Sequence, residues 1–172
     1  MNPWIIITSS KFGKGAIAAV DIPKGTKIIQ YKGKLVSKEL GEKLSDKHRD
    51  QITPIGTGTL WLFTLNDNYD IDGSRQANEA RYINHSCEPN CEAINYDDEE
   101  IWIESIKDIK KGEELNYDYG FDEPDERFPC FCGSKNCRGW IVSSEYEFKK
   151  GEKERLQKEY EEWLAEEGFT KD

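Results

Sequence analysis

Three cysteines, Cys130, Cys132 and Cys137, lie within eight residues of one another in a segment that also contains glycine and asparagine. Thiolates bind Zn²⁺ at about 2.3 Å in tetrahedral sites, and a structural zinc site takes four protein ligands. The segment supplies three of them, so the fourth has to come from elsewhere in the chain. The remaining soft candidates are His48, His85, Cys87 and Cys91. A disulfide with a spare thiol is the alternative, but near neighbours would close a small, strained loop, so zinc is favoured.

A second group of polar side chains, Asn-His-Ser-Cys-Glu, falls between Ile83 and Pro89. Such a group needs many hydrogen-bond partners when it is buried, and a ligand or a tight crossing of the chain would supply them. An Asn-His pair alone would more often be a turn or a satisfied buried pair. The density of polar groups nevertheless indicates a candidate site.

Two tyrosines, Tyr117 and Tyr119, alternate in a segment predicted to be a strand, so we expect them to share one face. From this segment alone, the two tyrosine rings could equally well line a binding site or cover the hydrophobic core. The residues Gly13-Lys14-Gly15 lack the third glycine of a dinucleotide fingerprint, and no helix follows them. The chain has no G-x-S-x-G motif, no Walker loop and only two histidines, so serine hydrolysis and phosphoryl transfer find no support.

The elements that must position these residues are mostly short strands. β-branched or aromatic runs bounded by Gly, Asp, Asn or Pro predict strands at residues 4–8, 16–20, 27–31, 60–65 and 101–106. A helix is predicted over residues 37–50, with Ser37 as its N-cap. A second helix is predicted in the charged tail from an apolar stripe: Leu156, Tyr160, Trp163 and Leu164. This pattern favours a mostly β domain of small sheets with a few short helices over a doubly wound α/β fold.

Composition limits the partners. The 172 residues, of which 36% are hydrophobic and 12% aromatic, suffice for one globular domain. The net charge of −10 repels phosphate backbones and attracts a polypeptide rich in Lys and Arg, so we expect no direct nucleic-acid binding. No apolar run approaches the roughly 20 residues of a membrane span, and no signal peptide is apparent. We therefore expect no membrane association and an intracellular protein, cytoplasmic in a microbe or nuclear in a eukaryote.

Taken together and in this order, these segments resemble the SET-domain protein lysine methyltransferases that carry a zinc-binding post-SET tail. The resemblance begins at residues 11–15, continues through residues 31–33, 81–90 and 114–119, and ends at residues 130–140. It implies a SET domain over residues 1–121, a post-SET zinc-binding segment over 122–143 and a charged C-terminal helix over 144–172. It also implies a pseudoknot, in which residues 84–87 thread beneath the loop near residues 117–119.

The same resemblance implies two cofactors. S-adenosylmethionine would lie against the backbone of Lys14, Gly15 and Ala16, with Asn84 and His85 also in contact. Zinc would take Cys87 as its fourth ligand beside Cys130, Cys132 and Cys137, which leaves Cys91 as an ordinary thiol. Two aromatic residues of the tail would help to enclose the cofactor or the substrate: Phe131 and Trp140.

The reaction implied is methyl transfer to the amine of a lysine in a histone or another Lys-rich protein. The amine must be neutral, and since a free lysine has a pKa of about 10.4, a narrow apolar channel would have to favour the uncharged form. By resemblance, Tyr119 is the catalytic tyrosine, Tyr31 orients the amine, and Tyr117 occupies the Tyr/Phe position that sets the degree of methylation, with monomethyl-lysine expected. The acidic runs at residues 97–100 and 122–126 are candidate substrate contacts, although solvated loop charges explain the first run equally well.

The alternative is a catalytically silent, zinc-stabilised SET-like module that binds a partner through its acidic face or its C-terminal helix. The presence of Tyr31, Tyr119, Asn84 and His85 together favours the enzyme, because a binding module has no reason to contain all four.

Overall fold

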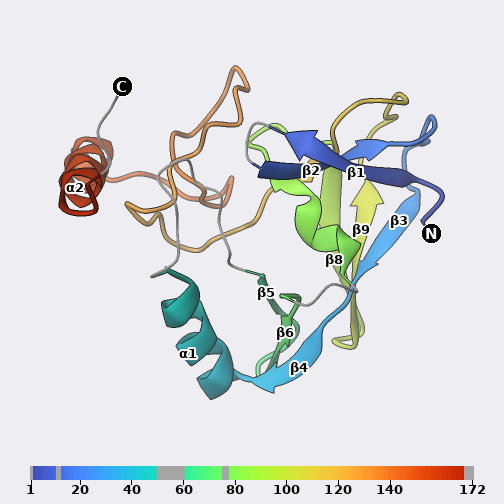
Figure 1. Cartoon of the computed structure of the whole chain (residues 1–172), viewed down its shortest axis with the longest axis horizontal. Coiled ribbons are helices and arrows are strands. Elements are labelled where there is room, and N and C mark those ends of the chain that lie inside the picture. The colour runs from blue at the N-terminus through green and yellow to red at the C-terminus, as the bar shows by residue number, and fades with distance from the viewer. Residues whose placement is uncertain (1, 11–12, 50–60, 75–77, 169–172) are drawn as a thin grey trace.

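The computed structural model describes residues 2–10, 13–49, 61–74 and 78–168. Within these residues four small β-sheets form the body of the molecule, and helix α2 lies at its C-terminal end, away from the N-terminal hairpin (Figure 1). The prediction of a mostly β fold of small sheets with few helices is confirmed. No helix within the described residues is both long and apolar enough to cross a lipid bilayer.

The first sheet is an antiparallel hairpin of β1 (Ile5–Ser10) and β2 (Gly13–Ala18). The predicted strand over residues 16–20 begins earlier than expected, because Gly13, Lys14 and Gly15 pair with the end of β1 in spite of their low strand propensity. Pairing with a neighbouring strand therefore overrides local preference at this position.

Two antiparallel three-stranded sheets follow. One has the order β3 (Lys27–Tyr31), β9 (Glu100–Ser105), β8 (Cys91–Tyr96), and the other has the order β4 (Lys34–Ser37), β6 (Tyr69–Asp72), β5 (Leu62–Thr64). The strand predicted over 27–31 is confirmed, whereas the one predicted over 60–65 is shorter, and residue 60 lies outside the described part of the chain. On β9, Ile101 and Ile103 are buried while Trp102 between them is partly exposed, which is the period-two pattern of a strand with one core face.

The fourth sheet pairs β7 (Asn84–His85) with β10 (Asn116–Tyr117) in parallel. The two strands are far apart in the sequence: Glu114, which lies just before β10, is 30 positions from Asn84. Ser86 N–H donates to the Tyr117 carbonyl (3.1 Å), and the Asn90 side chain donates to the Glu114 carbonyl (2.9 Å). The polar residues after Ile83 are thus largely satisfied by another segment of this chain. β10 ends at Tyr117, so the expectation that Tyr119 lies on the same strand is wrong, because the backbone leaves the pairing before residue 119.

In the part of the chain that the structure describes, the helices are α1 (Lys38–Arg49), the short 3-10 helix η1 (Glu79–Tyr82) and α2 (Glu152–Glu166). The Ser37 hydroxyl accepts a hydrogen bond from Leu40 N–H (3.4 Å), as its predicted N-cap role requires. In α2, Leu156, Tyr160 and Leu164 are buried, which confirms the predicted apolar stripe.

Two apolar clusters hold the chain together. The larger fills the space between the sheets and contains the buried isoleucines of β9 and Leu115. The smaller contains Phe128, Cys130 and Ile141, and Trp163 of α2 packs against it. The C-terminal helix is therefore fixed to the cysteine-containing tail by an apolar contact.

Candidate active site and zinc centre

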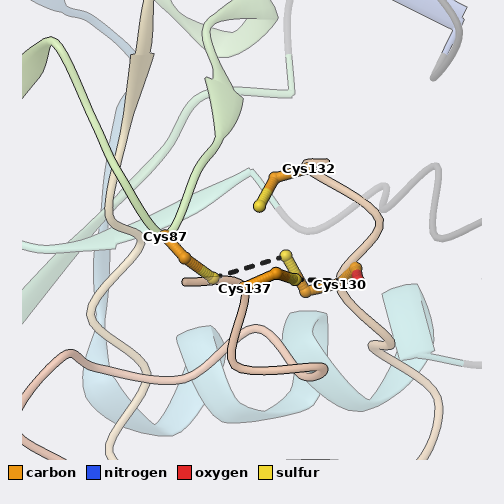
Figure 2. Close-up of side chains that lie close together, drawn as sticks. All are labelled: Cys87, Cys130, Cys132 and Cys137. Atoms are coloured by element: carbon orange, nitrogen blue, oxygen red, sulfur yellow. Dashed lines mark hydrogen bonds between the residues drawn. The ribbon is translucent and has the colours of Figure 1, made fainter. Parts of the chain in front are cut away.

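The cysteine cluster is formed by one residue after β7 and three residues of the tail. The sulfurs of Cys87, Cys130, Cys132 and Cys137 all lie within 4.8 Å of one another, and Figure 2 shows them converging on one space. Cys87 Sγ lies 3.6 Å from Cys130 Sγ. Two thiolates on a tetrahedral Zn²⁺ are separated by about 3.8 Å, given Zn–S bonds of about 2.3 Å. The four sulfurs thus fit a tetrahedral thiolate site.

The fifth cysteine lies elsewhere. Cys91 is fully buried at the start of β8, and its thiol donates to Asn90 Oδ1 (3.5 Å). Burial raises the pKa of Cys91 to about 12, so the thiol stays protonated at neutral pH. It has the properties of a core side chain.

The four clustered thiols differ in acidity. Burial raises the pKa of Cys87 to about 11 and raises the pKa of Cys130 still further. Burial also acts on Cys132, but hydrogen bonds from Ser134 and from backbone N–H groups lower the pKa of this thiol to about 6. Four neighbouring thiolates need a cation to exist together, and a divalent metal supplies that charge.

Aromatic rings from three elements gather around the end of β10. Tyr31 of β3 and Tyr117 are buried, and the ring of Tyr119 lies 4.9 Å from that of Tyr117. Phe63 of β5 lies 5.2 Å from Tyr31 and 6.4 Å from Tyr117, measured between ring centroids. The structure therefore brings the three predicted tyrosines together and adds a phenylalanine to them.

The tyrosine hydroxyls are neutral donors. Tyr31 Oη donates to the Trp61 carbonyl (2.7 Å), and Tyr119 Oη donates to the Ile83 carbonyl (3.2 Å). Burial raises the pKa of Tyr31, Tyr117 and Tyr119 above the ordinary tyrosine value. This group of rings is consequently apolar and uncharged, and backbone carbonyls fix the hydroxyls of Tyr31 and Tyr119.

A polar face lies next to β7, where Asn84 meets the N-terminal hairpin. Asn84 Nδ2 donates to the Lys14 carbonyl (3.2 Å) and to Glu114 Oε1 (2.8 Å). A Cβ added at Gly15 would lie 2.6 Å from Glu114 Oε1, so only glycine fits here without displacing that carboxylate. Ala16, the next residue, is fully buried. The structure thus places Lys14, Gly15 and Asn84 together, with a carboxylate beside them.

His85 faces the protein interior. Its Nδ1 accepts a hydrogen bond from Tyr119 N–H (3.2 Å), and its Nε2 lies 3.5 Å from Cys87 Sγ. Burial lowers the pKa of His85 to about 4, although Asp118 opposes this shift. The ring is therefore neutral, and because Nδ1 accepts, the proton sits on Nε2 and points at the cysteine sulfur. Both ring nitrogens of His85 thus have protein neighbours, so neither is free to hydrogen-bond a cofactor.

The two aromatic residues of the tail differ in exposure. Trp140 is buried, and its Nε1 has no hydrogen-bond partner within the described residues, while Phe131 is 45% exposed. A buried donor without a partner is uncommon and is a position where a ligand can bind.

Several site residues carried no signal that sequence reasoning used. Asn78, 2% exposed, accepts from Lys32 N–H through Oδ1 (3.1 Å) and donates to the Gly73 carbonyl through Nδ2 (3.4 Å). A Cβ at Gly73 would lie 2.5 Å from Tyr31 Oη, so a glycine is needed beside this hydroxyl. Phe63 falls within a predicted strand, but nothing in the pattern shows which ring it would meet.

Comparison with known proteins is consistent with this geometry. Residues 13–120 match the sequence profile of a protein family described as SET domain. The chain is 40% identical over 134 residues to the human protein named histone-lysine N-methyltransferase 2D. The matched region makes up 75% of this chain and 2% of the human protein. It is 37% identical over 139 residues to histone-lysine N-methyltransferase trithorax of Drosophila melanogaster, covering 79% of this chain and 4% of that protein.

The match to a fungal relative covers a larger share of the relative's length. This protein of Emericella nidulans, named histone-lysine N-methyltransferase, H3 lysine-4 specific, is 38% identical over 133 residues, covering 74% of this chain and 11% of the fungal protein. The chain therefore spans only a small part of the curated relatives that it matches.

Proposed function

The chain belongs to the SET-domain family, and we propose that it is an S-adenosylmethionine-dependent protein-lysine N-methyltransferase. The observation that carries this proposal is the parallel pairing of β7 with β10. It places the polar face around Asn84 next to the aromatic group around Tyr117, so one cofactor can reach from the first to the second.

The residues present fit the cofactor at its amino-acid end. The Lys14 carbonyl, the Asn84 amide and the Glu114 carboxylate offer hydrogen-bond acceptors for an ammonium group, and glycine at position 15 lets the backbone come close. Trp140 Nε1 is a free buried donor on the tail side within the described residues. When bound, S-adenosylmethionine would supply an electrophilic methyl group on a positively charged sulfur.

The tyrosines would prepare the acceptor amine. The rings of Tyr31, Tyr117, Tyr119 and Phe63 would line an apolar channel that excludes water and thereby favours the neutral form of a lysine amine. The Tyr119 hydroxyl, fixed by Ile83, and the Tyr31 hydroxyl, fixed by Trp61, would orient that amine for a straight line of attack. Aromatic faces also suit the positive charge on the methylated amine.

Zinc would be structural in this account. Cys87, Cys130, Cys132 and Cys137 would hold one Zn²⁺ with no open position, as a closed four-thiolate site requires. The metal would join the tail, residues 122–143, to the domain over residues 1–121. The helix in residues 144–172 would then secure the tail through Trp163.

For the substrate, we propose a Lys- and Arg-rich polypeptide, with the N-terminal tail of histone H3 as the first candidate because of the name of the fungal relative. The net charge of −10 supports a basic partner. Within the second acidic run, Asp122 and Glu123 are exposed, whereas Asp125 Oδ1 accepts a hydrogen bond from Arg127 N–H (2.9 Å). Asp122 and Glu123 are therefore the better candidates for substrate contact.

The proposal is tested by label transfer from isotopically labelled S-adenosylmethionine to histones, compared with histones whose lysines have been chemically acetylated. Transfer to the untreated histones alone identifies lysine as the acceptor. Equal transfer to both would point to another acceptor, and no transfer to any basic protein would favour the silent binding module.

A further inference from the structure

An ion pair links the cysteine-containing tail to the turn that carries Tyr119. Arg138 Nη2 donates to Asp118 Oδ2 (2.7 Å), with 14% and 20% of the two side chains exposed. The same carboxylate accepts hydrogen bonds from Gly120 N–H (3.1 Å) and Ser144 N–H (3.1 Å). With three donors, two of them backbone groups, the Asp118 carboxylate fixes both the turn after β10 and the chain that follows the tail.

The other end of this link is at the cysteine cluster. Arg138 follows Cys137 directly, and its backbone N–H donates to Cys87 Sγ (3.4 Å). Its position thus depends on the cluster through a covalent neighbour and through a hydrogen bond. A partly buried ion pair that loses one member leaves the other charge poorly compensated. A displacement of Arg138 is therefore expected to disturb Asp118 as well.

Tyr119 lies between two such supports. On one side its N–H is held by His85, and on the other side its neighbours Asp118 and Gly120 are held in one turn by the Asp118 carboxylate. His85 Nδ1 is also 3.7 Å from Asp118 Oδ1, so the two supports touch each other.

We propose that Arg138 is a positioning residue for Tyr119, which transmits the assembled state of the cysteine cluster to the catalytic tyrosine through Asp118. The role given to Tyr119 rests on the proposed function, whereas the coupling itself is a property of the fold. The Arg138 side chain donates to the Asp118 carboxylate, and its backbone N–H donates to Cys87 Sγ. Its side chain is therefore taken to act on Tyr119 through the carboxylate.

The test compares Arg138→Met with Arg127→Met, a matched loss of a partly buried arginine from the same tail. Arg127 Nε lies 3.7 Å from Glu126 Oε1, and 29% of the Arg127 side chain is exposed. Selective ¹⁵N labelling of tyrosine gives up to eight backbone signals, and Tyr119→Phe assigns the one from Tyr119. Zinc content, affinity for S-adenosylmethionine, and kcat and KM on a histone H3 peptide are measured on the same samples.

The proposal expects Arg138→Met to keep one zinc per chain, to shift the Tyr119 amide signal, and to lower kcat by about 10- to 100-fold, the range that a misplaced reacting group produces. Arg127→Met should leave the signal and kcat unchanged. Arg138→Lys should restore most of both, because it returns the charge. Asp118→Asn should also shift the Tyr119 amide signal, because the carboxylate that Arg138 contacts accepts from Gly120 N–H and Ser144 N–H as well.

A Tyr119 amide signal that Arg138→Met leaves in place overturns the proposal, whether or not the protein is active. Loss of zinc in proportion to loss of kcat overturns it as well, because Arg138 would then only close the tail. A wild-type protein that methylates nothing, yet shows the expected shift, would sink the proposed function and leave the coupling standing.

Discussion

The backbone N–H of Tyr119 donates a hydrogen bond to Nδ1 of His85, whose other ring nitrogen lies 3.5 Å from the sulfur of Cys87. One neutral imidazole therefore lies between the cysteine cluster and the tyrosine to which we give the catalytic role. The arrangement depends on the parallel pairing of β7 and β10, which sets His85 opposite Tyr117. The cysteine cluster and the backbone of Tyr119 are consequently connected through a single side chain, His85.

Replacing Tyr119 by Phe removes the hydroxyl that donates to Ile83 and keeps the ring. We expect kcat on a histone H3 peptide to fall about 10²-fold, equivalent to roughly 2.7 kcal/mol of barrier. Tyr69→Phe is the control, because Tyr69 is an exposed tyrosine of β6. Steady-state kinetics decides, and full activity of Tyr119→Phe would remove this residue from the mechanism.

Replacing Tyr117 by Phe should change the product instead of the rate. Tyr117 is buried against Phe63 and Tyr119, so loss of its hydroxyl enlarges the apolar channel where a methylated amine must turn. The expected product shifts from monomethyl-lysine toward di- and trimethyl-lysine, read by intact-mass spectrometry of the peptide. An unchanged product ratio would show that other side chains set the available space.

Two substitutions distinguish a cysteine of the zinc-binding cluster from the buried cysteine outside it. Cys87→Ser should release the metal and lower the melting temperature by roughly 10 °C or more, since structural zinc binding is also folding free energy. Cys91→Ala should keep one zinc per chain, because Cys91 lies in the core at the start of β8 and outside the cluster. Elemental analysis of both proteins is the measurement, and the reverse result would show that the ligand assignment is wrong.

Asn84→Ala should weaken binding of S-adenosylmethionine by 1–3 kcal/mol, or roughly 5- to 150-fold, because the polar groups around Lys14 lose a partner. Asn95→Ala is the control, since this asparagine donates to the Leu65 carbonyl and to Asp98 on the β8–β9 side. Titration calorimetry measures both, and equal affinities for the two variants would exclude Asn84 from the cofactor site.

Sequence reasoning succeeded where local pattern determines structure. β3 and the buried stripe of α2 follow from strand propensity and helical spacing, and the grouping of three cysteines is visible in the chain itself. The strands β4 and β6 were missed because they are four residues long and carry charged side chains. Such strands are stabilised by their neighbours in the sheet more than by their own composition.

The contacts that complete the site are tertiary and have no local signal. Arg138 meets Asp118 across 20 positions of chain, and Asn84 meets Glu114 across 30. Charged residues are abundant in this sequence, so spacing alone cannot identify which of them pair. The end of β10 at Tyr117 could likewise not be predicted from the sequence, because the alternation of tyrosines continues past the last paired residue.

Site-resolved mass spectrometry of histone H3 incubated with the protein and labelled S-adenosylmethionine tests the central claim most directly. The account predicts labelled methyl groups on lysine side chains, present with the wild-type protein and strongly reduced with Tyr119→Phe. Labelled methyl groups on residues other than lysine, or a yield that Tyr119→Phe leaves unchanged, would contradict it.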